Sequence, residues 1–134
     1  MVKASLALLS DKTKKRPFLW SKSFKICEIG QMSIQIRRKG IRVNLAKNRK
    51  IIKIFVKLID STYFVIFEDE SVEDPYYRVE NGCKDLSIFI VQDGFDMREQ
   101  GIELAPLTSI PYAFIDWKEK HTVLCEMGSV KEQQ

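Results

Sequence analysis

The side chains able to do chemistry are few and scattered. The 134-residue chain holds one histidine, His121, and three cysteines, Cys27, Cys83 and Cys125, which lie far apart in the sequence. An imidazole acts as a general base beside a nucleophile, and a metal site needs several ligands in one place. His121 has neither in its alternating segment KHTVLC. We therefore expect a structural or surface histidine, no enzyme, and no metal or other cofactor.

The cysteines and the acidic stretches add no further site. No C-x-x-C pair occurs, and this cysteine pattern indicates a reducing compartment rather than a zinc site or a disulfide framework. Residues 68–74 (EDESVED) and 93–96 (DGFD) lack the carboxylate spacing, central glycine and closing glutamate of a calcium loop. Neither G-x-G-x-x-G nor G-x-x-x-x-G-K occurs, so we expect no phosphate-binding loop.

Charge is divided unevenly along the chain. Residues 1–60 hold 16 Lys and Arg against 3 Asp and Glu, a balance of +13, whereas residues 61–134 hold 6 against 15, a balance of −9. One interpretation is a basic face for anionic lipid or nucleic acid. The other is that the two halves pack in one domain and offset each other's field.

Three basic clusters lie in or near the first half, at residues 14–16, 37–39 and 47–50. A protein that binds single-stranded nucleic acid interleaves aromatic residues with such charges as stacking platforms, and these clusters are nearly free of them. Phe18 and Trp20 follow the first cluster, but their alternating apolar pattern indicates core residues. We expect no nucleic-acid partner, and an anionic membrane surface stays open as an alternative. No run approaches the roughly 20 apolar residues of a membrane span, and no cleavage site follows the short apolar run near the N-terminus. We expect a soluble chain that is not secreted.

Apolar residues recur with a period of two and are mostly β-branched or aromatic, which predicts strands. Any site must therefore be positioned by strands and their connections. Ile52, Ile54 and Val56 alternate with other residues, whereas residues 63–67 and 86–91 are denser apolar runs, typical of strands buried on both faces or of a sandwich core. The Lys-rich residues 51–59 suit a protected edge strand. Turn signals separate these runs, and no helix is evident. The sequence predicts a single all-β domain, an antiparallel β-sandwich.

The segment at residues 102–117 (IELAPLTSIPYAFIDW) is interrupted by Pro106 and Pro111, which are incompatible with regular central pairing. We expect an irregular edge, or a strand that crosses between sheets, with Tyr112, Phe114 and Trp117 offering aromatic surface. Such a segment either captures an extended peptide, by strand addition or by docking prolines on aromatic rings, or forms an ordinary corner of the sandwich.

Three blocks together resemble one protein family: residues 18–30 (FLWSKSFKICEIG), 75–94 (PYYRVENGCKDLSIFIVQDG) and 104–117 (LAPLTSIPYAFIDW). The family is the adaptor-binding domain, also called the SHR-binding domain, of the vacuolar protein sorting-associated thirteen bridge-like lipid-transfer proteins. The resemblance covers most of residues 18–125. The matching motif residues are Trp20, Ser21, Phe24, Ile26 and Gly30; then Pro75, Tyr77, Arg78, Val79, Glu80 and Asn81; then Leu104, Pro106, Ser109, Pro111, Tyr112, Ala113 and Phe114.

The resemblance implies a repeat-type adaptor-binding module, without catalytic activity, that binds short Pro-x-Pro motifs of adaptor proteins. It implies that such binding targets a lipid-transfer protein to organelle membrane contact sites, where the chain is cytoplasmic and peripheral. Adaptor proteins and neighbouring repeats are then its partners. The peptide-binding residues are then Pro106, Ser109, Pro111, Tyr112 and Phe114. We expect residues 1–70 to end one repeat, residues 71–127 to begin the next, and residues 128–134 to form a tail.

The third block departs from the family pattern. Phe114 stands where the family usually has Trp, Ile115 is an extra residue before Asp116, and Trp117 and Lys118 replace the usual acid–proline ending. These departures leave the expected fold unchanged and bear on peptide specificity. A basic module that binds anionic membranes, or a purely structural spacer repeat, remains an alternative function.

Asn81 closes the motif that begins at Pro75. Alternation along a strand places Tyr77, Val79 and Asn81 on one face and Arg78 on the other. If that first face is turned to the core, the Asn81 amide points inward at the end of the sheet. A buried amide there needs hydrogen-bond partners, and the backbone of an adjacent turn supplies them. We expect Asn81 to be a structural latch, with Pro75, Tyr77 and Arg78 as the rest of its motif.

Overall fold

The computed structural model describes residues 3–5, 18–37, 49–70 and 73–129. The basic cluster at residues 14–16, and parts of those at 37–39 and 47–50, lie outside this described part. The elements in chain order are β1 (Lys3–Ala4), β2 (Phe24–Lys25), β3 (Gly30–Arg37), β4 (Arg49–Ile59), β5 (Thr62–Asp69), β6 (Tyr77–Glu80), β7 (Leu86–Gln92), α1 (Met97–Gln100), β8 (Ile102–Leu104), β9 (Ser109–Tyr112) and β10 (Val123–Ser129).

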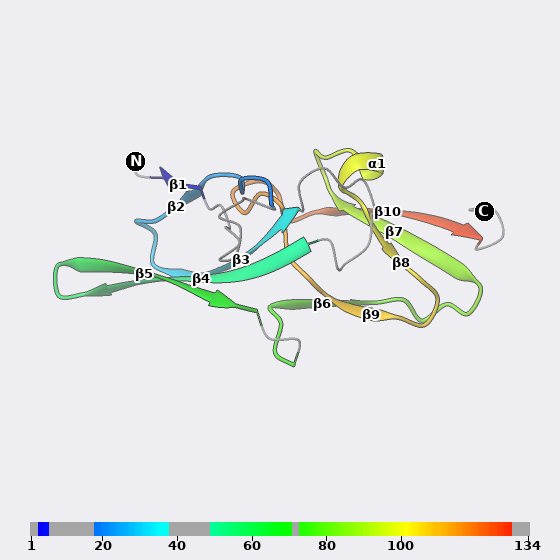
Figure 1. Ribbon diagram of the computed structural model, residues 1–134, viewed down its shortest axis with the longest axis horizontal. Helices are drawn as coiled ribbons and strands as arrows, with labels where there is room; N and C mark the ends of the chain where they lie inside the picture. Colours follow the sequence, from blue (N-terminus) through cyan, green and yellow to red (C-terminus); the bar gives the residue numbers. More distant parts are fainter. Residues whose placement is uncertain (1–2, 6–17, 38–48, 71–72, 130–134) are drawn as a thin grey trace, which may run out of the picture.

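The prediction of an all-β, antiparallel fold is confirmed. In the described part, the strands form small sheets with the orders β1-β2, β3-β4-β5, β10-β7-β8 and β6-β9, and each of these pairings is antiparallel. Figure 1 shows β1 to β5 at one end of the molecule and β6 to β10 at the other. We call the part built from β1 to β5 the N-terminal lobe and the part built from β6 to β10 the C-terminal lobe.

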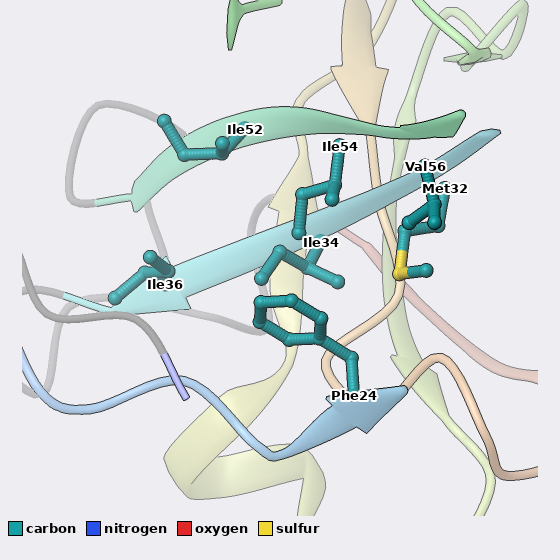
Figure 2. Close-up of a cluster of buried hydrophobic side chains, with 7 residues drawn as sticks. All are labelled: Phe24, Met32, Ile34, Ile36, Ile52, Ile54 and Val56. Atoms are coloured by element: carbon teal, nitrogen blue, oxygen red, sulfur yellow. The ribbon is translucent and has the colours of Figure 1, made fainter. Parts of the chain in front are cut away.

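The core of the N-terminal lobe follows from the alternation along β3 and β4. Ile34 lies opposite Ile52 in the antiparallel register, so their side chains share one face of the sheet. Phe24 of β2 projects onto that face, as Figure 2 shows. Each such fully buried aliphatic side chain stabilises the fold by about 1.5–3 kcal/mol. The buried cluster consists of Phe24, Met32, Ile34, Ile36, Ile52, Ile54 and Val56.

The core of the C-terminal lobe lies between two sheets. The β10-β7-β8 sheet contributes Ile90, Ile102 and Leu104, and the segment that includes β9 contributes Tyr112 and Phe114. Val79 of β6 and Val123 of β10 pack against this cluster and are half-buried. The lobe is therefore a small sandwich with its apolar residues on facing surfaces.

Residues 102–117 pass through both lobes, which confirms the expectation of a segment that crosses between sheets. Residues of β8 pair with β7, and β9 pairs with β6, where Pro111 lies opposite Arg78. Phe114 then forms a parallel bridge with Ile34 of β3, and its carbonyl oxygen accepts a hydrogen bond of 3.1 Å from the Gln35 amide. Trp117 packs against both hydrophobic clusters. This segment therefore joins the two lobes.

Two expectations about individual strands are wrong. The Lys-rich strand β4 is central in its sheet, between β3 and β5, and is not an edge. The apolar run of β5 is not buried on both faces. In the described part of the chain, β5 pairs with β4 alone and lies at the edge of the sheet. Tyr63, Phe64 and Phe67 are 48%, 44% and 47% exposed. By contrast, β7 has a neighbour on each side, and Ile90 and Val91 are buried.

The acidic turn at residues 93–96 leads into the short helix α1, which the sequence analysis did not predict. Asp96 is its N-cap, and the side-chain Oδ1 accepts a hydrogen bond of 2.7 Å from the backbone N–H of Arg98. At the C-terminus, β10 includes Gly128 and Ser129, the first residues of the expected tail, and residues 130–134 lie outside the described part. Cys27, Cys83 and Cys125 are free.

Candidate peptide-binding site

Two buried glutamines fix the irregular segment after β9. The Gln35 Nε2 donates to the Ala113 carbonyl oxygen over 2.7 Å. The Gln92 Oε1 accepts from the backbone N–H groups of Ile115 and Asp116, both at 2.9 Å, and its Nε2 donates to the Asp116 carbonyl oxygen at 2.8 Å. Both glutamine side chains are buried. They replace the ladder bonds that this segment lacks, and buried backbone groups require such partners.

Asn81 follows β6 directly and connects three stretches of backbone. Its Nδ2 donates to the carbonyl oxygens of Leu86, Leu104 and Ala105 at 2.8, 3.0 and 3.2 Å. Its Oδ1 accepts from the Cys83 N–H at 2.9 Å. The residue is 2% exposed. This one amide therefore ties the turn between β6 and β7 to the end of β8, and its cost of burial is offset by partners on both its oxygen and its nitrogen.

The peptide-binding residues expected from the sequence lie in different environments. Tyr112 and Phe114 are 2% and 5% exposed, so the expectation that they offer aromatic surface is wrong. Both rings face the core because β9 turns them toward the sheet of β7 and β8. Pro106 and Pro111 are half-buried. Ser109 is exposed, and its hydroxyl accepts a hydrogen bond of 3.0 Å from Nη1 of Arg78, so β6 and β9 present these two polar residues together.

Six rings pack against one another in a continuous set that runs from the buried core to the surface, and we call them the aromatic cluster. Consecutive centroids lie 5.6 Å (Tyr112–Phe114), 5.4 Å (Phe114–Tyr77), 4.9 Å (Tyr77–Tyr76), 5.7 Å (Tyr76–Trp117), 4.4 Å (Trp117–His121) and 4.4 Å (His121–Phe114) apart. Most of these pairs meet edge to face, and His121 stacks on Phe114. The buried Phe114 ring thus supports a partly exposed aromatic surface.

The exposed members of the aromatic cluster come from separate segments. Tyr76 and Tyr77 are 39% and 37% exposed, His121 is exposed, and Trp117 is half-buried. The His121 ring is held by a contact of 2.8 Å between its Nε2 and the Trp117 carbonyl oxygen. Tyr77 belongs to β6, which has β9 as its one partner strand in the described part. Among the residues that the structure describes, the other edge of β6 therefore has no partner strand, and this open edge lies beside the aromatic surface.

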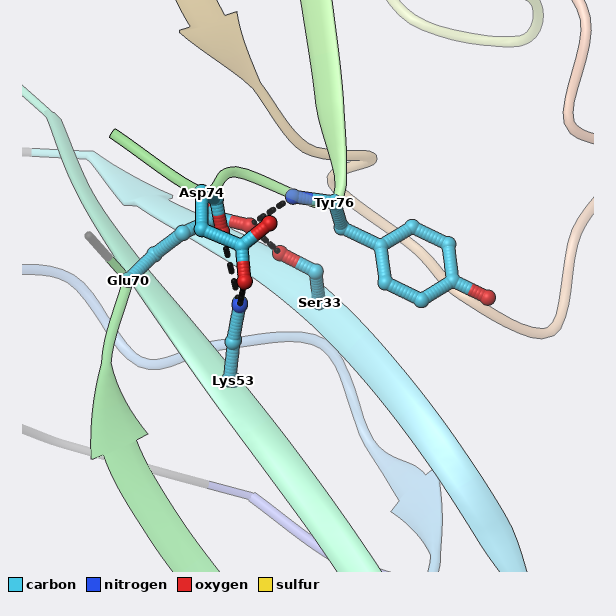
Figure 3. Close-up of polar contacts among 5 residues, drawn as sticks. All are labelled: Ser33, Lys53, Glu70, Asp74 and Tyr76. Atoms are coloured by element: carbon cyan, nitrogen blue, oxygen red, sulfur yellow. Dashed lines mark hydrogen bonds and ion pairs between the residues drawn. The ribbon is translucent and has the colours of Figure 1, made fainter. Parts of the chain in front are cut away.

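A polar network on the N-terminal lobe positions Tyr76. The Glu70 Oε1 accepts a hydrogen bond of 2.6 Å from the backbone N–H of Tyr76 and one of 3.3 Å from the Ser33 hydroxyl. The Lys53 ammonium donates to the Asp74 carbonyl oxygen at 2.8 Å and lies 4.0 Å from the Asp74 carboxylate. Figure 3 shows the Tyr76 ring directed away from this network. The segment leading into β6 is thereby held against the sheet of β3 and β4.

A cavity of about 260 Å³ adjoins the aromatic cluster at Trp117. Phe24 and Met32 supply apolar lining, and the charged lining residues are Lys118 and the Lys25–Glu28 ion pair, whose atoms lie 3.0 Å apart. The Lys118 ammonium also donates to the hydroxyl of Ser23 at 3.2 Å. Trp117 is at once a wall of this cavity and a member of the aromatic cluster. The cluster and the cavity form one candidate site at the junction of the lobes.

Sequence reasoning missed two of the residues that build this site. Tyr76 is next to a motif residue, and its neighbour Pro75 is half-buried, but nothing local places the Tyr76 ring against Trp117. His121 is on the surface, as one of the two expected possibilities, and its packing on Phe114 depends on the return of the chain after Trp117. A signal that was available is the density of aromatic residues at positions 76–77 and 112–117.

A protein-family model described as "Vacuolar-sorting associated protein 13, adaptor binding domain" matches residues 3–119. The chain belongs to this family. The resemblance carried by the three sequence blocks is thereby confirmed. A comparison with curated proteins finds no match.

The family description names adaptor binding, which is the role of a protein-interaction module. In residues 3–5, 18–37, 49–70 and 73–129, no group of three or more His, Cys, Asp or Glu side chains is arranged to hold a metal ion. No helix in the same residues is long and apolar enough to cross a membrane.

Proposed function

We propose that this adaptor-binding domain binds a short, extended, proline-containing segment of an adaptor protein at the aromatic cluster. The observation that carries the proposal is the surface formed by Tyr76, Tyr77, Trp117 and His121 beside the open edge of β6. Proline-rich segments dock on aromatic surfaces because their extended conformation is already restricted before binding. The edge of β6 offers main-chain groups to the same segment.

In this proposal, the residues expected from the family motif have different roles. Ser109 and Arg78, joined at 3.0 Å, offer polar contacts next to the aromatic surface. Tyr112 and Phe114 act from below, because their buried rings support Tyr77 and His121. Pro106 and Pro111 shape the crossing segment rather than bind directly. The replacement of the usual Trp by Phe114 then alters the support of the site more than its exposed face.

Such an interface is small, so one module binds at about micromolar affinity, and neighbouring modules or a membrane tether strengthen it. Capture of an adaptor on an organelle would place a lipid-transfer protein, of which this domain is a part, at a membrane contact site. In that setting the chain works in the cytoplasm, at the periphery of the membrane.

Isothermal titration calorimetry with a Pro-x-Pro peptide tests the proposal. We expect saturable heat with a Kd of about 1–100 μM, and a loss of at least about tenfold when both prolines are replaced by alanine. The substitution Tyr76→Ser should weaken binding by about tenfold. Tyr63→Ser is the matched control, because Tyr63 is an exposed tyrosine on β5 in the other lobe. Equal affinity of both variants for the peptide would contradict the proposed site.

We further propose that residues 1–70 end one repeat and residues 71–127 begin the next. In support, the two hydrophobic clusters draw their members from separate stretches of the chain, residues 24–56 and 90–114. A chain cut between the two, mixed as separate fragments, should reassociate through the pairing of β3 with Phe114. If either fragment, measured by itself, instead shows full protection of its backbone amides from hydrogen exchange, the halves are independent folding units.

A second candidate function is binding to an anionic membrane surface, which the balance of +13 in residues 1–60 favours. It predicts sedimentation with vesicles that contain phosphatidylserine, weakening steeply as salt is raised from about 50 to 300 mM. Equal sedimentation with neutral vesicles would show that the charge serves the fold. A purely structural spacer role is supported if neither peptide nor vesicle binds.

A further inference from the structure

A second pocket lies between the lobes, apart from the exposed aromatic surface. It has a volume of about 170 Å³. Its apolar lining includes Ile51, Ile102 and Pro111, and its polar lining residues are Gln35, Arg49, Lys50, Glu70 and Tyr112. The Lys50 ammonium is paired with the Asp69 carboxylate at 2.6 Å. The lining of the pocket therefore combines residues of both lobes. The volume suits a group of a few heavy atoms.

Three of the polar lining residues carry a buried side-chain atom without a hydrogen-bond partner in the described part of the chain. These atoms are Nη1 of Arg49, Oε2 of Glu70 and the hydroxyl of Tyr112. Native proteins pair nearly all buried polar atoms, because an unpaired one costs about 1–3 kcal/mol. The Tyr112 side chain is 2% exposed, so its hydroxyl faces the pocket rather than bulk solvent. Nη1 of Arg49 and the Tyr112 hydroxyl are donors that lack an acceptor, whereas Oε2 of Glu70 is an acceptor that lacks a donor.

Arg49 also lacks a carboxylate partner among the described residues. Its Nη2 is held by the carbonyl oxygens of Gln100 and Gly101 at 3.1 and 2.8 Å, and this leaves Nη1 for the pocket. Burial lowers the pKa of Arg49 to about 10, with Tyr112 opposing that shift and Arg37 adding to it, so the guanidinium is still a cation at neutral pH. Burial raises the pKa of Tyr112 to about 12, so its hydroxyl remains a neutral donor. Glu70 lines the same pocket, but among the described residues no carboxylate oxygen, including its own, forms an ion pair with Arg49, and a buried cation without an anion in direct contact is unfavourable.

We propose that this pocket binds a single carboxylate group through the Arg49 guanidinium and the Tyr112 hydroxyl. Guanidinium groups and phenolic donors are well matched to carboxylate oxygens. The Glu70 carboxylate in the same lining disfavours a doubly charged phosphate, and its unpaired Oε2 can accept a donor carried next to the bound carboxylate. An acidic side chain of a protein partner has this chemistry: one carboxylate on a short apolar stem. The proposal does not depend on the proline-binding role.

The test uses propionate, the side-chain fragment of glutamate, added to the full chain and followed by amide NMR shifts. We expect saturable shifts of Gln35, Gly101 and Ala113 with a Kd on the order of 1 mM, as befits so small a ligand. Chloride at equal ionic strength should give none. Phosphate should bind more weakly than propionate. No saturation, or tighter binding of phosphate, overturns the assignment.

Variants localise the site. Tyr112→Phe removes one oxygen and should weaken propionate binding about tenfold or more, as expected for a hydrogen bond to a charged group, without lowering Tm. Arg49→Gln should abolish saturation. Lys57→Gln, with the same loss of charge on an exposed position of β4, should bind as the parent does. Should Arg49→Gln fail to fold, Tyr112→Phe still decides: unchanged affinity for propionate in that variant contradicts the proposal. A failed Pro-x-Pro titration leaves this result unaffected, because propionate carries no proline.

Discussion

Replacement of Asn81 by alanine tests how the C-terminal lobe is held together. The variant loses the two N–H donors that three carbonyl oxygens share and the acceptor of the Cys83 N–H, and the buried Leu104 carbonyl oxygen loses this partner. A buried unpaired group costs about 1–3 kcal/mol, whereas the part-buried partners recover bonds to water. We expect the free energy of unfolding to fall by about 2–3 kcal/mol. For a chain of this size the loss corresponds to a decrease in Tm of roughly 10 °C.

Urea denaturation followed by circular dichroism measures that loss, with Gln31→Ala as the control. Gln31 is an exposed amide on β3, and its replacement should change stability by less than about 0.5 kcal/mol. Asn81→Asp keeps the acceptor for Cys83 but turns an anion toward three carbonyl oxygens, so it should be at least as destabilising as alanine at neutral pH. A loss within 0.5 kcal/mol for Asn81→Ala would refute the latch.

Three further outcomes follow from burial and hydrogen bonding. Ile54→Ala, at a fully buried site, should cost about 2–5 kcal/mol in urea denaturation, whereas Leu58→Ala on the same strand, 44% exposed, should cost less than about 1 kcal/mol. Glu70→Ala removes the acceptor of the Tyr76 N–H and should weaken peptide binding several-fold by calorimetry, and Glu70→Gln, which keeps an acceptor, should restore it. Burial raises the pKa of Tyr112 from 10.0 to about 12 in the folded chain. The contribution of the neutral hydroxyl to the free energy of unfolding is therefore complete below pH 10 and is lost as the pH rises toward 12. Tyr112→Phe should flatten that alkaline loss by up to about 2 kcal/mol, and an identical pH profile would contradict its cause.

The fold class could be predicted because its signals are local. Alternation along residues 51–59 places Ile52, Ile54 and Val56 on one face whatever the rest of the chain does, and these residues are buried. Pro106 and Pro111 likewise exclude a regular central strand by their own chemistry. The inward direction of the Asn81 side chain follows from the same alternation.

The order of strands could not be predicted from such signals. A run of aromatic and β-branched residues is the same in a strand buried on both faces, such as β7, and in an exposed edge strand, such as β5. The difference depends on which strands pair, and pairing is decided by contacts between residues far apart in the chain. The Lys-rich pattern of β4 misled for the same reason, since this central strand has an exposed Lys57 and a Lys53 whose ammonium is bound at Asp74.

The sites depend on contacts between the lobes, and no local pattern contains them. The aromatic cluster needs Tyr76, Trp117 and His121 to converge from separate segments. The pocket between the lobes needs Arg49 of β4 to meet Tyr112 of β9, across 63 positions of sequence. The sequence around each of these residues does not indicate a binding site. The site is evident only from the spatial neighbours and the burial of each residue.

The most direct test of the central claim is an NMR titration of the labelled chain with a Pro-x-Pro peptide. Binding at the aromatic cluster predicts saturable shifts that are largest for the Trp117 indole and for the amides of Tyr76 and Tyr77, with little change on β5. The absence of saturable shifts, or a maximum on β5 at Tyr63 and Phe64, would contradict it.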